Sequence, residues 1–87
     1  MHQVIVYSKP GCHLCEAVIS ILAELSKKKR TFELTVIDIT KDESILEKYF
    51  LTIPVVSVDG QDVYDAEEIG LSADRKNKLD DLVSSLN

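Results

Sequence analysis

Two cysteines near the start of the chain carry the chemistry that its sequence suggests. Cys12 and Cys15 are its only cysteines, and they follow directly on residues 7–11 (YSKPG). A pair with two residues between its members serves as a redox couple, supplies half of a metal site, or forms a structural clip. The elements on either side of the pair must favour one of these uses.

The chain is short and acidic, which limits the classes of function open to it. Its 87 residues suffice for one small domain, and a hydrophobic share of 45% is ordinary for a globular protein. The formal net charge of −5 argues against a general nucleic-acid binder. Residues 27–30 (KKKR) form the only basic run. We interpret it as a solvated helix end that suits the helix dipole, with a partner-docking patch as the alternative.

The sequence predicts a cytoplasmic protein. Its first residues lack a cationic region before a long apolar segment, and no apolar run approaches the ~20 residues that span a membrane. A secreted disulfide scaffold would carry more cysteines, spread along the chain. In a reducing cytoplasm, a C-x-x-C motif is more often catalytic or metal-binding than structural.

The cysteines lie within a strand–helix–strand pattern. Residues 3–7 (QVIVY) are typical of a strand buried on both faces. From residue 12 to about residue 30 the apolar residues recur at helical spacing, and residues 31–39 predict a second strand. Since no room remains for another element, the pattern predicts a βαβ unit with parallel strands and a right-handed crossover.

The second half of the chain predicts a short helix, a hairpin and a last helix. Thr40 and Glu43 fit a capping box at the start of the short helix. Residues 55–58 and 61–64 predict two strands joined by a tight turn. The last helix is expected to begin at about Ser72.

The predicted order β-α-β-α-β-β-α defines an α/β fold within a single domain, residues 1–87. A parallel βαβ half joined to an antiparallel ββα half gives a four-stranded mixed sheet flanked by helices. A C-x-x-C that begins the first helix of such a unit is the sequence signature of a thioredoxin-like redox domain.

This placement predicts different roles for the two cysteines. At the first turn of a helix, free N–H groups and the dipole favour a thiolate and lower a cysteine pKa from ~8.5 into the range of ~3.5–7.5. Because the thiolate is the attacking species, Cys12 is the expected nucleophile. Cys15 starts the apolar stripe and is the expected resolving thiol. Lys9 adds a cation beside Cys12 and would also orient an anionic thiol substrate.

Two further positions leave alternatives open. His13, when protonated, would stabilise the Cys12 thiolate, or it faces solvent with no role in proton transfer. A cis bond before Pro54 would hold the Ile53 backbone against the Cys12 sulfur, where its N–H and C=O would pair with an extended substrate. A trans Pro54 would instead begin an edge strand.

The motif of residues 7–15, followed about forty residues later by Thr52-Ile53-Pro54 and a hairpin, resembles a glutaredoxin. The resemblance extends over nearly the whole chain. It implies a thioredoxin-like fold, with Cys12 as nucleophile and Cys15 as resolving thiol. It also implies that Lys9 is the cation on the thiolate side and that residues 52–54 form a substrate-binding loop with a cis proline.

Two stretches depart from the glutaredoxin pattern. His13-Leu14 replaces the usual Pro-Tyr between the cysteines, which makes the motif C-H-L-C. Glutaredoxins also carry a Gly-Gly-x-Asp segment that binds the charged end of glutathione, whereas residues 64–68 here are YDAEE. Asp65 and Glu68 repeat a capping pattern in this segment. Such an acidic segment should repel a carboxylate, which argues against glutathione as the natural substrate.

We therefore predict a thiol–disulfide oxidoreductase with a redox-active Cys12–Cys15 pair, no metal and no resident cofactor. Its expected partners are a disulfide-containing protein or a small-molecule thiol, with a reductase or glutathione as electron donor. We expect a monomer that binds neither nucleic acid nor membrane. Two alternatives remain: an iron–sulfur or metal-binding module, although one C-x-x-C supplies only two of the four ligands that zinc takes, and a thioredoxin-fold interaction domain with idle cysteines.

Overall fold

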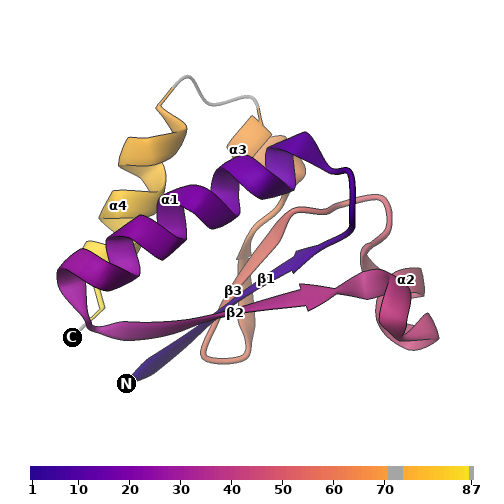
Figure 1. Cartoon of the computed structure of the whole chain (residues 1–87), viewed down its shortest axis with the longest axis horizontal. Helices are drawn as coiled ribbons and strands as arrows, with labels where there is room; N and C mark the ends of the chain where they lie inside the picture. The colour runs from indigo at the N-terminus through magenta and orange to yellow at the C-terminus, as the bar shows by residue number, and fades with distance from the viewer. Residues whose placement is uncertain (71–73, 87) are drawn as a thin grey trace.

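The computed structural model describes residues 1–70 and 74–86, which form a four-stranded mixed sheet with helices on both faces (Figure 1). In chain order the elements are β1 (His2–Ser8), α1 (His13–Lys29), β2 (Phe32–Asp38), the 3-10 helix η1 (Ile39–Lys41), α2 (Glu43–Tyr49), β3 (Val55–Val58), β4 (Gln61–Tyr64), α3 (Ala66–Gly70) and α4 (Arg75–Ser84). The predicted α/β fold is confirmed. No helix within the described ranges is both long enough and apolar enough to span a membrane.

Strand β1 lies inside the sheet, whose strand order is β2-β1-β3-β4. It runs parallel to β2 and antiparallel to β3, as the βαβ and ββα halves predict. Val6 is opposite Val36 on one side and Val56 on the other. Because β1 ends at Ser8, the middle of the sheet leads directly into the segment that carries the cysteines.

The larger part of the core lies between the sheet and the helices α1, α3 and α4 (Figure 1). Its buried side chains are Val4, Val6, Val18, Leu22, Leu25, Phe32, Val56, Ile69, Leu79 and Val83. Helix α4 turns an apolar stripe inward, since Leu79 and Val83 are fully buried and Leu82 and Leu86 pack partly buried against the cluster. Its predicted start at Ser72 lies outside the described residues.

A smaller core on the opposite face centres on Tyr49, at the end of α2. The Tyr49 ring stacks on Tyr7 of β1 with 4.2 Å between the ring centroids. Its hydroxyl donates a hydrogen bond of 2.9 Å to the Asp62 carboxylate of β4. Burial of the phenol raises the pKa of Tyr49, and the hydrogen bond to Asp62 is the second cause of this rise, so the phenol keeps its proton. Tyr49 therefore ties α2 to both β1 and β4.

The predicted capping box at Thr40 is wrong. Helix α2 begins two residues later, where the Asp42 carboxylate accepts the Ile45 N–H at 3.1 Å. Thr40 lies in η1, and the Asp38 carboxylate accepts its N–H at 2.9 Å. Two aspartates therefore supply the acceptors in this segment, and a carboxylate is a stronger acceptor than the Thr40 hydroxyl.

The hairpin between β3 and β4 turns at Asp59 and Gly60, whose φ values of 51° and 88° both lie in the left-handed region. The Asp59 carboxylate accepts the Gln3 N–H at 2.8 Å and pairs with the His2 imidazole. Two hydrogen bonds lower the pKa of Asp59: the one from the Gln3 N–H has the larger effect, and the one from the His2 imidazole adds to it. The hairpin is thus fastened to the first residues of β1.

We predict that Leu22→Ala destabilises the protein by about 2–5 kcal/mol, because Leu22 is fully buried and its truncation leaves a cavity. Urea unfolding followed by circular dichroism measures the change. Leu51→Ala is the matched control, since that leucine is 83% exposed and should change the unfolding free energy by less than about 0.5 kcal/mol. Equal losses in the two variants would contradict this packing.

We also predict that the stabilising effect of Asp59 depends on pH. A carboxylate whose pKa is lowered by folding stabilises above its unfolded pKa of ~3.9 and loses that effect as the pH falls through its folded pKa. Asp59→Asn removes the charge and still suits a turn before glycine. The variant should be less stable than the parent at about pH 7 and equally stable near pH 2, as measured by urea unfolding. A difference independent of pH would exclude the charge as its source.

Candidate redox site

A tight turn presents Cys12 at the end of β1. The Cys12 N–H donates to the Lys9 carbonyl at 3.4 Å, and Gly11 takes a φ of 80° that side chains rarely adopt. The chain reverses through this turn, and α1 begins immediately after Cys12. Pro10-Gly11 thus follows the end of the strand and brings the start of the helix back against the sheet.

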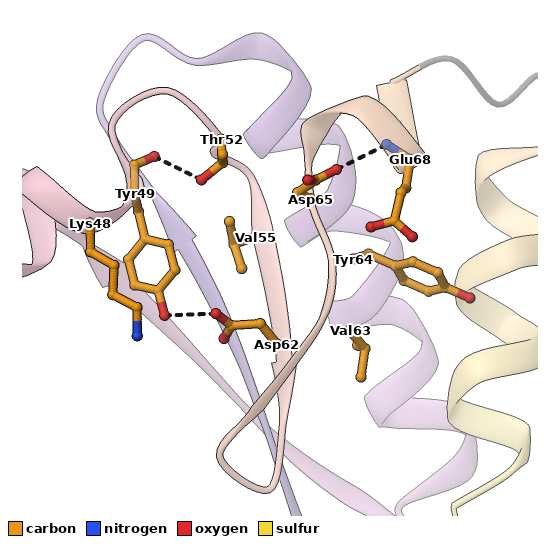
Figure 2. Close-up of a pocket in the computed structure, with 9 residues that line it drawn as sticks. All are labelled: Lys48, Tyr49, Thr52, Val55, Asp62, Val63, Tyr64, Asp65 and Glu68. Carbon is orange, nitrogen blue, oxygen red and sulfur yellow. Dashed lines mark hydrogen bonds between the residues drawn. The ribbon is translucent and has the colours of Figure 1, made fainter.

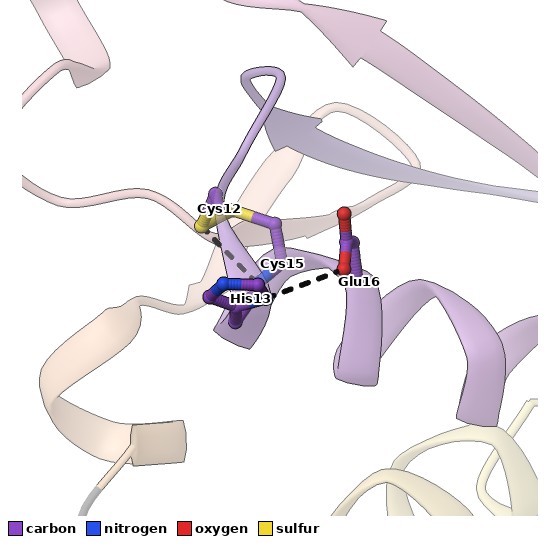
Figure 3. Close-up of a disulfide and its surroundings, with 4 residues drawn as sticks. All are labelled: Cys12, His13, Cys15 and Glu16. Carbon is purple, nitrogen blue, oxygen red and sulfur yellow. Dashed lines mark hydrogen bonds and ion pairs between the residues drawn. A yellow bond between two sulfur atoms is a disulfide. The ribbon is translucent and has the colours of Figure 1, made fainter.

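Cys12 and Cys15 are joined by a disulfide, with 5.2 Å between their Cα atoms (Figure 3). Cys12 is the N-cap of α1, and its sulfur accepts the Cys15 N–H at 3.2 Å. Cys15 is only 1% exposed, whereas Cys12 is partly exposed. The two sulfurs therefore differ in their access to a partner, although their catalytic roles stay predictions.

His13 points away from the disulfide. Its side chain is 96% exposed, and its Nδ1 atom lies 3.6 Å from a Glu16 carboxylate oxygen (Figure 3). This is the position that the solvent-facing alternative requires. Lys9 is also exposed, and its backbone carbonyl accepts the Cys12 N–H. The roles predicted for His13 and Lys9 stay predictions.

The peptide bond between Ile53 and Pro54 is cis, which decides between the two alternatives for this loop. Pro54 is fully buried. The Ile53 N–H donates to the Tyr49 carbonyl at 3.1 Å and is thus engaged within the chain, while the pairing of the loop with a substrate stays a prediction. The Thr52 N–H and hydroxyl donate to the same oxygen, at 3.0 and 3.3 Å. The last turn of α2 leaves this carbonyl without a helical partner, and the loop supplies its donors.

Helix α3 extends from this loop to the C-H-L-C segment. The Ala66 N–H at its start donates to the Thr52 carbonyl at 2.9 Å. At its other end, a side chain on Gly70 would lie 3.1 Å from the Leu14 methyl group, so a glycine there permits a close approach. The predicted cap is confirmed, because the Asp65 carboxylate accepts the Glu68 N–H at 3.1 Å. The chain's own carboxylate thus occupies this helix end.

A cavity of about 330 Å³ lies beside the loop (Figure 2). It is lined by Lys48, Tyr49, Thr52, Val55, Asp62, Val63, Tyr64, Asp65 and Glu68. Most of these residues were not predicted as part of a site, because α2, β4 and α3 meet here only in the folded chain. Asp62, a charged residue within a short strand, was the signal that the sequence offered.

The described part of the chain contains no group of three or more His, Cys, Asp and Glu side chains placed to hold a metal ion. The two cysteine sulfurs are bonded to each other, and His13 faces Glu16. The metal-binding alternative therefore finds no complete set of ligands among residues 1–70 and 74–86.

Solved structures support the thioredoxin-like fold. Protein Ne2328 of Nitrosomonas europaea, known from a solution structure, is 33% identical to this chain. The two structures have a TM-score of 0.63 over 79% of this chain and 87% of that protein. A thioredoxin of Halobacterium salinarum, in mutant form, has a TM-score of 0.69 at 18% identity, over 98% of this chain and 74% of its own. A Fasciola hepatica thioredoxin has a TM-score of 0.68 at 20% identity, over 99% and 81%. At such identities the two thioredoxins show the fold alone.

The family comparison covers almost the whole chain. The search of curated proteins finds no match. The family model described as "Glutaredoxin-like domain (DUF836)" matches residues 3–84, which include the disulfide, the cis-proline loop and the acidic helix α3. This chain therefore belongs to the glutaredoxin-like domain family.

Proposed function

We propose that this protein is a thiol–disulfide oxidoreductase, with Cys12 as nucleophile and Cys15 as resolving thiol. The observation that carries the proposal is the inequality of the two bonded cysteines. Cys12 is partly exposed at the start of α1, whereas Cys15 is buried. In such a cysteine pair, the exposed cysteine can react with a substrate, and the buried cysteine reacts only with the mixed disulfide formed at the first.

The first step is attack by the reduced form of Cys12 on a substrate disulfide. The Cys15 N–H and the positive end of α1 stabilise the Cys12 thiolate. This thiolate forms a bond to one substrate sulfur while the substrate disulfide breaks. The second substrate sulfur leaves as a thiolate and takes a proton from water.

The second step is attack by Cys15 on the mixed disulfide. Cys15 loses its proton and its sulfur bonds to Cys12, which expels the remaining substrate sulfur as a thiolate. Two electrons have then passed from the protein dithiol to the substrate, and the Cys12–Cys15 disulfide is the product. The Cα separation of 5.2 Å lies within the ~4.4–6.8 Å range that disulfides need, so the step requires little movement of the helix backbone.

We further propose Lys9 and the loop Thr52-Ile53-Pro54 as the substrate-binding surface, and a reductase rather than glutathione as electron donor. The cap formed by Asp65 supports the choice of donor, since it fills the helix end at which glutathione's carboxylate would bind. A reducing cytoplasm suits a dithiol that must be regenerated for each cycle. No resident cofactor takes part in these steps.

We predict that Cys15→Ser accumulates a mixed disulfide with a substrate, whereas Cys12→Ser forms none and has no reductase activity. Without the resolving thiol, the first step still proceeds but the second cannot. Non-reducing electrophoresis and insulin reduction with dithiothreitol as donor measure the two outcomes. Full activity of the Cys12→Ser variant would contradict the assignment and leave the protein an interaction domain with idle cysteines.

We also predict that Cys12 in the reduced protein reacts with iodoacetamide at a rate that titrates well below the ~8.5 of a free thiol. The rate is measured against pH in the Cys15→Ser variant, where Cys12 is the only thiol. A free cysteine peptide is the control. A profile that coincides with that of the peptide would exclude thiolate stabilisation by α1.

A further inference from the structure

Two exposed apolar side chains lie beside the proposed substrate loop. Phe50 is 54% and Leu51 83% exposed, and they directly precede Thr52-Ile53-Pro54 in the chain. Among the described residues, the other exposed large apolar side chains are Met1 and Val36, at 75% and 45%. Neighbouring apolar side chains next to a reactive group favour a contact surface for a partner.

The cavity on the other side of Thr52 is acidic. The carboxylates of Asp62, Asp65 and Glu68 line it together with the ammonium group of Lys48, and a second ammonium group, that of Lys78, lies over the Tyr64 ring at its wall. Within residues 1–70 and 74–86, none of these three carboxylates forms an ion pair. Asp62 accepts the Tyr49 hydroxyl, and Asp65 accepts a backbone N–H, so both accept from neutral donors (Figure 2). Three carboxylates against two nearby ammonium groups leave the cavity with an excess of negative charge.

The aromatic walls of this cavity already attract ammonium groups. The Lys48 Nζ atom lies 5.2 Å from the centroid of the Tyr49 ring. The Lys78 Nζ atom lies 5.1 Å from that of Tyr64 and donates to the Glu68 carbonyl at 3.0 Å. Two lysines of the chain itself thus show which kind of group these walls hold, independently of the carboxylates.

The apolar pair and the acidic cavity are joined through the substrate loop. Thr52 lines the cavity, follows Leu51 in the chain, and accepts the Ala66 N–H of α3 through its carbonyl. Helix α3 in turn approaches Leu14, between the two cysteines, at Gly70. The apolar pair and the acidic cavity therefore flank the loop that is proposed to bind the substrate.

We propose, on the basis of the oxidoreductase function above, that the substrate is a protein whose disulfide is flanked by an apolar residue and by a Lys or Arg. The apolar residue packs on Phe50 and Leu51, and the cationic group enters the acidic cavity. Electrons flow as in the two steps described, from the protein dithiol to the substrate disulfide. The same charges disfavour small anionic disulfides.

Two synthetic peptides test the charge preference. Both carry one disulfide and the same apolar residue, and they differ only in a Lys or a Glu at one flanking position. With dithiothreitol as donor, we expect kcat/KM for the Lys peptide to exceed that for the Glu peptide by about tenfold at low salt. The ratio should fall as the ionic strength rises, because salt screens the exposed carboxylates.

A neutralised variant, without the cavity's three carboxylate charges, tests whether the cavity causes the ratio of kcat/KM between the Lys and Glu peptides. Asp62→Asn, Asp65→Asn and Glu68→Gln together keep the hydrogen-bond acceptors and remove three charges, and the ratio should fall to about 1–2. Its matched control, Glu24→Gln with Glu33→Gln and Asp81→Asn, removes three charges from residues that do not line the cavity and should keep the ratio. Asp62→Asn alone, which leaves the cap of α3 in place, should lower it partly.

The apolar pair is tested separately. Phe50→Ser with Leu51→Ser should lower kcat/KM for both peptides by a similar factor of about five, because apolar contact does not distinguish their charges. Val36→Ser is the control, since Val36 is 45% exposed on β2 and outside the loop. Loss of activity in the control to the same degree would overturn the role of the pair.

A binding measurement separates this proposal from the proposed function. It uses the unsubstituted protein and versions of the two peptides in which serine replaces both peptide cysteines. Selective binding of the Lys version, with no reduction of either disulfide peptide, supports the surface and rejects the oxidoreductase. Equal reduction of both peptides, or an undiminished ratio in the neutralised variant, overturns the surface and leaves the oxidoreductase standing. A dimer in solution that the neutralised variant abolishes would assign the surface to a second copy and overturn the proposal as well.

Discussion

The hydrogen bond from the Cys15 N–H to the Cys12 sulfur is the interaction on which the redox site depends. It makes the reactive sulfur the N-cap of α1, a position at which Ser, Thr, Asp or Asn is usual. A sulfur is a weak acceptor, so packing must hold the helix in place, and Val18 and Leu22 supply it from the buried face of α1. The group that would react is thereby also the group that ends the turn and begins the helix.

A second junction, at Tyr49, links the loop Thr52-Ile53-Pro54 to β1, the strand that precedes the cysteines. One carbonyl oxygen accepts the N–H of Thr52, the hydroxyl of Thr52 and the N–H of Ile53. The ring of the same residue stacks on Tyr7, and its hydroxyl binds Asp62. The C-terminal end of α2 thus links the loop, β1 and β4, and a change at this residue would be felt in the loop and in the acidic cavity together.

Features that neighbouring residues determine were predicted from the sequence, whereas features that depend on residues far apart in the chain were not. The strands at residues 55–58 and 61–64, and the cap formed by Asp65, depend on neighbouring residues and were predicted. The cap predicted at Thr40 was wrong because Asp38 binds the Thr40 N–H within η1, and Asp42 caps α2 in its place. The cis bond was left open, since residues 52–54 alone do not determine it. The contact of Tyr49 with Asp62 joins elements that only the folded chain brings together, so the charge of Asp62 within a short strand was the one local sign of the cavity.

The acidic helix α3 shows how a shared fold can change its preferred ligand. The first N–H groups of a helix need acceptors, which come either from a ligand or from the chain. Here the Asp65 carboxylate fulfils that need, and Glu67 and Glu68 add charge to the same turn. A bound anion would have to displace a tethered carboxylate and face its neighbours, whereas a cation meets charges that no ion pair within the described ranges neutralises. On the proposal made here, the thioredoxin-like fold keeps its cysteine pair and its cis proline, while the flank of the pair would favour cations over anions.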